Sequence, residues 1–107
     1  MPSPRPLSTP AAAEAASTYC FAVQAAADPG VMPRVMGLFA KRNLVPSRWH
    51  SDVTNIPGRG PEIVIDVQVG GLTPEEGDYI ARCLRQQVYV QSVLTSIKEA
   101  APGARTA

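Results

Sequence analysis

Apolar residues in the first half of the chain follow two different spacings, which predict a strand and then a helix. From Tyr19 to Ala25 they occupy nearly every position, as is typical of a central strand, with Phe21 and Val23 facing the core. From Val31 to Arg42 they recur at helical spacing and form one apolar stripe: Val31, Val35, Leu38 and Phe39. Gly37 lies inside this helix, and we expect a close approach between helix and sheet to explain it.

The next two apolar runs predict a β-hairpin. Residues 44–54 and 62–69 both alternate, and residues 55–61 between them are rich in Pro and Gly. Pro46 has no N–H to donate to a neighbouring strand, so the first of these two strands is predicted at the edge of the sheet.

A second helix begins at a clear N-terminal signal. Thr73 has the side chain of an N-cap, Pro74 suits the first helical position, and Glu76 completes a capping box. The helix is predicted to reach Gln86, and residues 88–97 form a last strand rich in β-branched residues. The helix positions expected to point inward are Ile80, Cys83 and Leu84.

The order strand, helix, strand, strand, helix, strand predicts an α+β fold. With right-handed crossovers it gives a ferredoxin-like βαββαβ sandwich, a four-stranded antiparallel sheet with two helices on one face and the second and fourth strands at its edges. Residues 19–98 are enough for this one domain, whereas residues 1–18 and 99–107 are poor in core-forming side chains and are expected to be flexible tails.

Charge and cysteine content argue against nucleic-acid binding and against a metal site. Ten Lys and Arg are balanced by nine Asp and Glu, and they are spread along the chain rather than gathered into the basic stripe of a nucleic-acid binder. Cys20 and Cys83 are too few and too far apart for a metal site, so we expect two small core residues and neither metal nor cofactor. No secretory signal or membrane-spanning run is recognisable, which favours a cytoplasmic protein without a membrane partner.

Two functional classes, RNA-recognition domains and enzymes, fit this sequence poorly. An RNA-recognition domain needs stacking aromatic residues on both central strands, and residues 62–69 contain none. For an enzyme, the only histidine is His50, next to Trp49, and no nucleophile–base or carboxylate pair has recognisable spacing. We therefore expect a protein that is not an enzyme.

The remaining candidate site is the turn Asp28–Pro29–Gly30, which opens the first helix at Val31 and Met32. Because the first N–H groups of a helix have no partner inside it, such a turn can hold a carboxylate or another small anion. The same turn can also be a simple connector between strand and helix, and the residues alone leave both interpretations open.

The segment from Asp28 to Arg42 resembles the start of an ACT domain, and in particular the regulatory (small) subunit of acetohydroxyacid (acetolactate) synthase. Asp28, Pro29, Gly30 and Val31 match the effector loop of that family, and Arg34-Val35, Gly37-Leu38-Phe39 and Arg42 match its first helix. Two positions depart from the pattern: Ala27 stands in place of a polar residue, and Val45 stands in place of an effector-binding asparagine.

The resemblance implies a non-catalytic regulatory module that binds an amino acid or similar effector against the second strand of a neighbouring subunit. It also implies a homodimer or higher homo-oligomer and a catalytic partner from amino-acid biosynthesis. On this interpretation a carboxylate rests on the N–H groups of Gly30, Val31 and Met32, and Asp28 attracts an ammonium group. The remaining effector-binding candidates are Pro29 in the turn and Val45, Arg48 and His50 near the facing strand. The alternative is a structural dimerisation domain with no small-molecule ligand.

Overall fold

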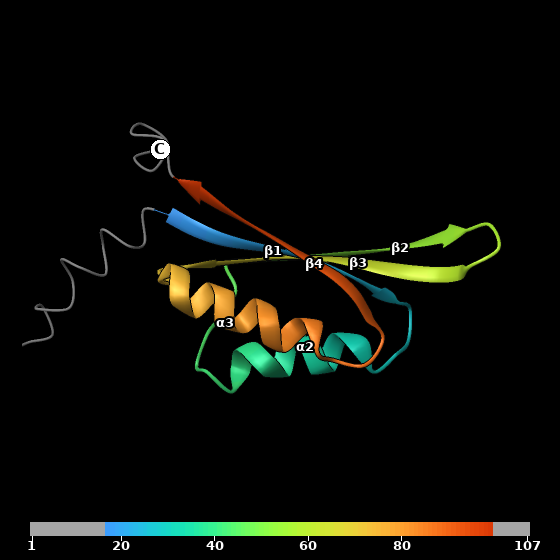
Figure 1. Ribbon diagram of the computed structural model, residues 1–107, viewed down its shortest axis with the longest axis horizontal. Helices are drawn as coiled ribbons and strands as arrows, with labels where there is room; N and C mark the ends of the chain where they lie inside the picture. The colour runs from blue at the N-terminus through green and yellow to red at the C-terminus, as the bar shows by residue number, and fades with distance from the viewer. Residues whose placement is uncertain (1–16, 100–107) are drawn as a thin grey trace, which may run out of the picture.

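The computed structural model describes residues 17–99, which form one antiparallel sheet covered on one face by two helices (Figure 1). Along the chain the elements are β1 (Ser17–Ala26), α2 (Val31–Ala40), β2 (Arg48–Ile56), β3 (Gly60–Gly70), α3 (Pro74–Arg85) and β4 (Val90–Glu99). The strand order in the sheet is β2-β3-β1-β4. This order confirms the predicted ferredoxin-like fold, with the second and fourth strands at the edges. The predicted tails fall mostly on residues 1–16 and 100–107, outside the described residues.

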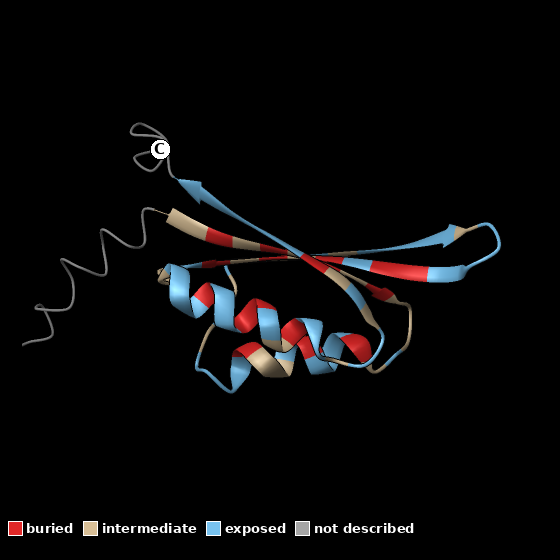
Figure 2. Ribbon diagram, viewed as in Figure 1, coloured by how far each residue is buried: buried red, intermediate tan, exposed pale blue. Residues whose placement is uncertain are grey.

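The core lies between the sheet and the helices, and the pairing of β1 with β3 builds its floor. Phe21 pairs with Val67 and Val23 pairs with Ile65, and all four side chains are fully buried. Figure 2 shows buried residues at intervals along the strands and along both helices. Because strand side chains alternate between faces, the intervening residues lie on the opposite, helix-free face, which we call the open face.

Helix α2 begins where the sequence predicts and ends earlier, at Ala40. Its buried residues are Val31, Val35 and Phe39, with Leu38 packed at the edge of the core. The chain leaves the helix through Asn43, whose φ of 59° is left-handed, while the Leu44 N–H donates to the Phe39 carbonyl. Asparagine tolerates this conformation better than most residues with a side chain, so it can stand where a glycine usually ends a helix.

The expectation for Gly37 is wrong. No atom lies within 4 Å of the position that a Cβ on Gly37 would take, so this residue is not required by a close contact with the sheet. Gly37 is half-buried and lines a hollow between α2 and α3.

The capping box at the start of α3 is confirmed by both of its hydrogen bonds. The Glu76 N–H donates to Thr73 Oγ1 at 3.1 Å, and the Thr73 N–H donates to Glu76 Oε1 at 3.0 Å. Two first-turn N–H groups thereby gain partners, which fixes where the helix starts.

The strands of the β2–β3 hairpin begin and end at other residues than the sequence predicts. Strand β2 starts at Arg48 rather than at residue 44, because the preceding segment leaves α2 and joins the sheet only where the Ser47 N–H donates to the Gln68 carbonyl. Strand β2 then continues to Ile56, and β3 already begins at Gly60. The turn between them is therefore shorter than predicted and comprises residues 57–59. The longer hairpin extends beyond the ends of the helices in Figure 1.

Both cysteines are only half-buried, which corrects the expectation that they are core residues. Cys20 belongs to the open face, since it alternates with Tyr19 and Phe21, whose rings face the helices. Cys83 lies on the side of α3 that faces α2, at the edge of the core.

A buried carboxylate lies on the open face near the hairpin. Glu62 is 1% exposed, accepts a hydrogen bond from Gln24 Nε2 at 2.9 Å, and forms a salt bridge with Arg59. The Ser92 hydroxyl donates to Gln24, so the network runs across three strands. Hydrogen bonding from Gln24 and then from Arg59 lowers the pKa of Glu62 below its ordinary value.

Candidate functional site

The turn between β1 and α2 is held by its own aspartate. The Gly30 N–H donates to Asp28 Oδ2 at 2.9 Å, and the Val31 N–H donates to the Asp28 carbonyl at 3.0 Å. Asp28 is in turn fixed by its own N–H, which donates to the Ala26 carbonyl at 2.8 Å. Two of the three N–H groups expected to hold a ligand carboxylate are thus already paired within the turn.

Gly30 lies between two charged groups of opposite sign. A Cβ at this position would lie 2.9 Å from Arg34 Nη1 and 3.2 Å from Asp28 Oδ2, while the φ of −80° is one that any residue adopts. The absence of a side chain at Gly30 therefore allows the Arg34 guanidinium and the Asp28 carboxylate to pack against its backbone. The sequence interpretation did not include Arg34 in the site, although its position four residues after Gly30 on a helix was the available signal.

The residues expected from the second strand face elsewhere. Arg48 and His50 point to the open face, where Arg48 Nε lies 3.8 Å from Asp66 and His50 Nε2 lies 2.9 Å from Asp52. Val45 precedes the strand and is 85% exposed.

These residues also lie at the far end of the sheet from the turn. Arg48 pairs with Gln68 and thereby with Cys20, whereas the turn follows Ala26. Six residues of strand separate these two levels, which is about 20 Å at strand spacing. A single chain therefore does not bring the two halves of the predicted site together.

Two hollows of the described surface lie between the two helices. One has a volume of about 550 Å³ and is lined by residues of α2, α3 and the segments after α2 and before α3. Among residues 17–99 no three His, Cys, Asp or Glu side chains gather as metal ligands, and neither helix is long and apolar enough to cross a membrane.

Comparison with known proteins gives a family match and several structural matches. Residues 11–101 match the family model described as ACT-like domain. No curated protein matches the chain. The ACT domain from GTP pyrophosphokinase of Chlorobium tepidum superposes with a TM-score of 0.61 at 10% identity, over 74% of this chain and 96% of that one.

Two further solved structures share the fold. The C-terminal domain of the MgtC protein from Mycobacterium tuberculosis has a TM-score of 0.61 at 16% identity, over 84% of this chain and 96% of that one. A formyltetrahydrofolate deformylase from Pseudomonas putida KT2440 has a TM-score of 0.53 at 14% identity, over 79% of this chain but only 29% of its own length. At these identities the superpositions demonstrate a common fold.

Proposed function

The chain belongs to the ACT-like domain family, and from that premise we propose that it is a non-catalytic regulatory module that binds a small amino-acid-type effector between two copies of itself. The observation that carries this proposal is that the two halves of the predicted site lie far apart within one chain. The Asp28 turn and the segment 45–50 lie at opposite ends of the sheet, so a second copy must complete the site.

The edge strand β2 offers a self-complementary way to add that copy. If two β2 strands pair antiparallel about Ser51, His50 of one chain lies across from the partner's Asp52, and Trp49 lies across from the partner's Val53. The first pair is polar and of complementary charge, and the second is apolar, as stable cross-strand pairs are. Val53 is 60% exposed in the single chain, and Trp49 is only partly buried. An unpaired edge of nine residues also has backbone groups available for such pairing.

The same pairing places the partner's segment 45–48 at the level of the Asp28 turn along the strand direction, with β2 and β3 between them. Thr54 pairs with Glu62, and Glu62 pairs with Ala26, so Thr54 marks the end of the sheet where the Asp28 turn lies. In the pairing about Ser51 the partner's Arg48 lies across from Thr54, and the partner's Val45 follows just beyond. Each dimer then has two equivalent sites, related by the two-fold axis.

The charges around Gly30 suit a zwitterion. The Asp28 carboxylate can accept hydrogen bonds from an ammonium group, and the Arg34 guanidinium can donate to a carboxylate. Both groups flank the space above Gly30. Because the Gly30 and Val31 N–H groups are already paired, Arg34 replaces them as the carboxylate-binding group in our proposal. Pro29 and Met32 are close to Gly30 in sequence, and Met32 is 38% exposed.

The proposal also concerns which enzyme this module regulates. The resemblance of the α2 segment to regulatory subunits of acetolactate synthase makes the catalytic subunit of an amino-acid biosynthetic enzyme the partner to test first. Val45 in place of the effector-binding asparagine removes one polar contact expected in those subunits. We therefore leave the identity of the amino acid open and screen for it.

The test is a thermal-shift screen against the standard amino acids, followed by titration of each hit into two glycine variants. Gly30→Val fills the space between Arg34 and Asp28, and we expect it to abolish binding. Gly37→Val is the matched control, since it introduces the same side chain in open space on the same helix. Unchanged binding by a folded Gly30→Val protein would show that the turn is a connector.

A structural dimerisation domain without a ligand is the second candidate. It is favoured by one observation: Asp28 satisfies the N–H groups of its own turn, as it would in a simple connector. A dimer that shows no thermal shift with any amino acid would support this candidate.

A further inference from the structure

A groove between α2 and α3 has the features of a second binding site. Arg34, which lies beside the Asp28 turn, lines its smaller hollow but not its larger one. Two hollows of about 550 Å³ and 490 Å³ adjoin one another there and share Leu38, Lys41 and Cys83 in their linings. Volumes of this size are typical of sites for small organic ligands. The groove is open partly because Gly37, on its α2 wall, has no side chain and no atom within 4 Å of where one would start.

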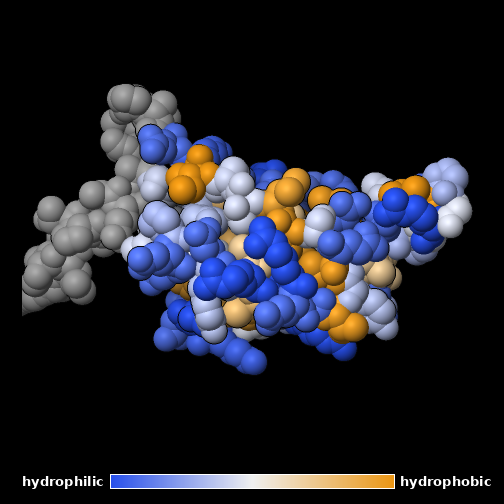
Figure 3. Space-filling view, viewed as in Figure 1, coloured by the Kyte–Doolittle hydropathy of each residue, from blue (hydrophilic) through white to orange (hydrophobic). Residues whose placement is uncertain are grey.

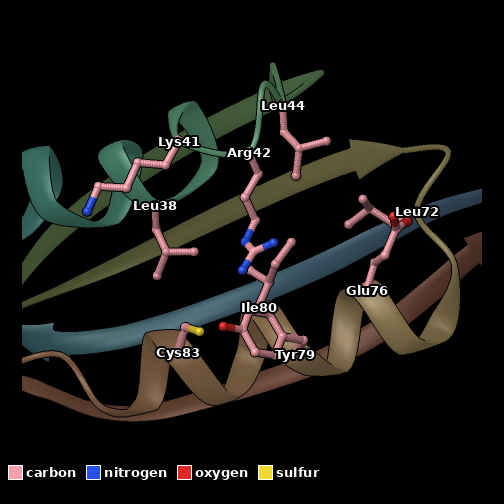
Figure 4. A pocket seen from close by; sticks show the side chains of 9 residues that line it. All are labelled: Leu38, Lys41, Arg42, Leu44, Leu72, Glu76, Tyr79, Ile80 and Cys83. Atoms are coloured by element: carbon pink, nitrogen blue, oxygen red, sulfur yellow. The ribbon is translucent and has the colours of Figure 1, made fainter.

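The floor of the larger hollow is apolar. Ile80 is buried in the core, and the aliphatic residues around it are only partly buried. In Figure 4 their side chains point into the space between the helices: Leu38, Leu44, Leu72 and Ile80. Apolar carbon that remains exposed in a concave surface is stabilised when a ligand covers it.

The rim of the same hollow is cationic. Arg42 extends from the end of α2 toward α3, and its guanidinium carbon lies 4.4 Å from the centre of the Tyr79 ring (Figure 4). Lys41 also lines the hollow, and the guanidinium carbon of Arg82, which lines neither hollow, lies 5.7 Å from the centre of the same Tyr79 ring. In Figure 3 strongly hydrophilic side chains lie over the helix layer, with less polar surface between them.

None of these three cations is neutralised within residues 17–99. The salt bridges of this region are Arg48–Asp66, His50–Asp52 and Arg59–Glu62, all on β2, β3 or their turn. Among the described residues Glu76 is the only acid that lines the groove, and one of its carboxylate oxygens already accepts a hydrogen bond from the Thr73 N–H. The groove therefore combines an apolar floor with an excess of positive charge.

We propose that this groove binds a small organic anion that carries both an aromatic ring and a carboxylate, joined by a short aliphatic chain. The ring would cover Leu38 and Ile80, and the carboxylate would accept hydrogen bonds from Arg42 and Lys41. Arg42 is suited to both parts, because a guanidinium stacks on aromatic rings and also binds carboxylates through two N–H groups. The ligand needs no ammonium group, which separates it from the zwitterion proposed for the Asp28 turn.

The experiment is a titration of the ¹⁵N-labelled full chain with 3-phenylpropionate, followed by amide correlation spectra. We expect saturable shifts at Leu38, Lys41 and Cys83 and none at the Asp28 turn. The neutral analogue 3-phenylpropanamide tests the charge, and we expect it to bind roughly tenfold more weakly, as for loss of a charge-assisted hydrogen bond.

Two variants complete the design. Arg42→Gln should weaken 3-phenylpropionate binding roughly tenfold, whereas Arg48→Gln, which changes an exposed arginine on the open face, should leave it unaltered. Absence of shifts in the groove, equal binding of the neutral analogue, or full binding by Arg42→Gln would overturn the proposal. So would an acidic peptide that occupies the groove while 3-phenylpropionate does not. Arg42 does not belong to the site at the Asp28 turn, and shifts at that turn are recorded separately, so failure of this proposal is distinguishable from failure of the proposed function.

Discussion

The ring of Tyr19 lies against the backbone of Gly77, so closely that a Cβ on Gly77 would overlap Cε2 and Cζ of the ring. Tyr19 is 6% exposed, and its hydroxyl donates to Asp78 Oδ1 at 2.7 Å. Burial, together with this hydrogen bond, raises the pKa of the Tyr19 hydroxyl above its ordinary value. The aromatic ring thus fits into the first turns of α3 only because position 77 has no side chain.

The two helix glycines should respond in opposite directions to alanine. Gly77→Ala must displace the packed Tyr19 ring and should lower the free energy of unfolding by about 1–3 kcal/mol. Gly37→Ala places a methyl group in open space and removes the helix penalty of glycine, so it should raise that free energy by about 1 kcal/mol. The midpoint of urea unfolding at constant slope measures both changes.

The Tyr19→Phe variant supplies a control for this pair. It keeps the ring and removes only the bond to Asp78, so Gly77→Ala should cost as much in the Tyr19→Phe background as in the wild type. A Gly77→Ala protein as stable as the wild type would mean that the ring has an alternative position.

Removing the N-cap side chain of α3 should lower the free energy of unfolding by less than Gly77→Ala does. Thr73→Ala leaves the Glu76 N–H without its side-chain acceptor, and we expect a loss of about 1 kcal/mol of unfolding free energy. Thr73→Ser keeps the hydroxyl and should restore most of that stability. Urea unfolding of the three proteins decides the matter, and equal midpoints for Ala and Ser would contradict the capping assignment.

The capping box also illustrates what the sequence could predict. Thr73 and Glu76 interact within one turn of chain, so their spacing alone specifies the contact. The alternation of β1 likewise identified Phe21 as a core residue, because a period of two divides a strand into an inner and an outer face.

The candidate site was less predictable because it depends on contacts between elements. Arg48 and His50 were expected to face the Asp28 turn from a neighbouring subunit. Within one chain they lie at the other end of the sheet, and this separation depends on sheet register, which is a property of paired strands. The groove at Cys83 was missed for a similar reason, since a hydrophobic stripe does not reveal how far two helices stand apart.

The buried carboxylate of Glu62 should make stability depend on acid pH. Its folded-state pKa is lowered, first by the hydrogen bond from Gln24 and then by Arg59, so the folded protein binds its proton less readily than the unfolded chain. The stabilisation is therefore fully present above the ordinary glutamate pKa and is lost as pH falls through the lower folded-state value. Glu62→Gln should be less stable than the wild type at neutral pH, and the difference should shrink on acidification.

Unfolding free energies of the two proteins, measured from neutral pH to below pH 4.5, test this dependence. Glu75→Gln, on the exposed first turn of α3, is the matched control and should not reproduce the change in the difference with pH. A constant difference between the Glu62→Gln and wild-type proteins across this range would mean that Glu62 does not titrate with unfolding.

The proposed dimer makes the sharpest prediction about β2. In a pairing about Ser51, Val53 lies against the partner's Trp49, and both chains carry this contact. Val53→Lys would place a charge beside that ring twice per dimer. The dissociation constant of the dimer should therefore rise roughly tenfold or more. The single chain should stay folded, because Val53 is 60% exposed and loses little packing.

Leu94→Lys is the control for this change, since Leu94 is 70% exposed on the other edge strand, β4. Sedimentation equilibrium should show a weakened dimer for Val53→Lys and an unchanged one for Leu94→Lys, with Trp49 fluorescence following the dissociation. The reverse result would place the interface at β4, where pairing leaves the Asp28 turn without a facing β2 strand. A wild-type protein that stays monomeric at high micromolar concentration would remove the basis of the interface site altogether, because one chain alone holds its two halves about 20 Å apart.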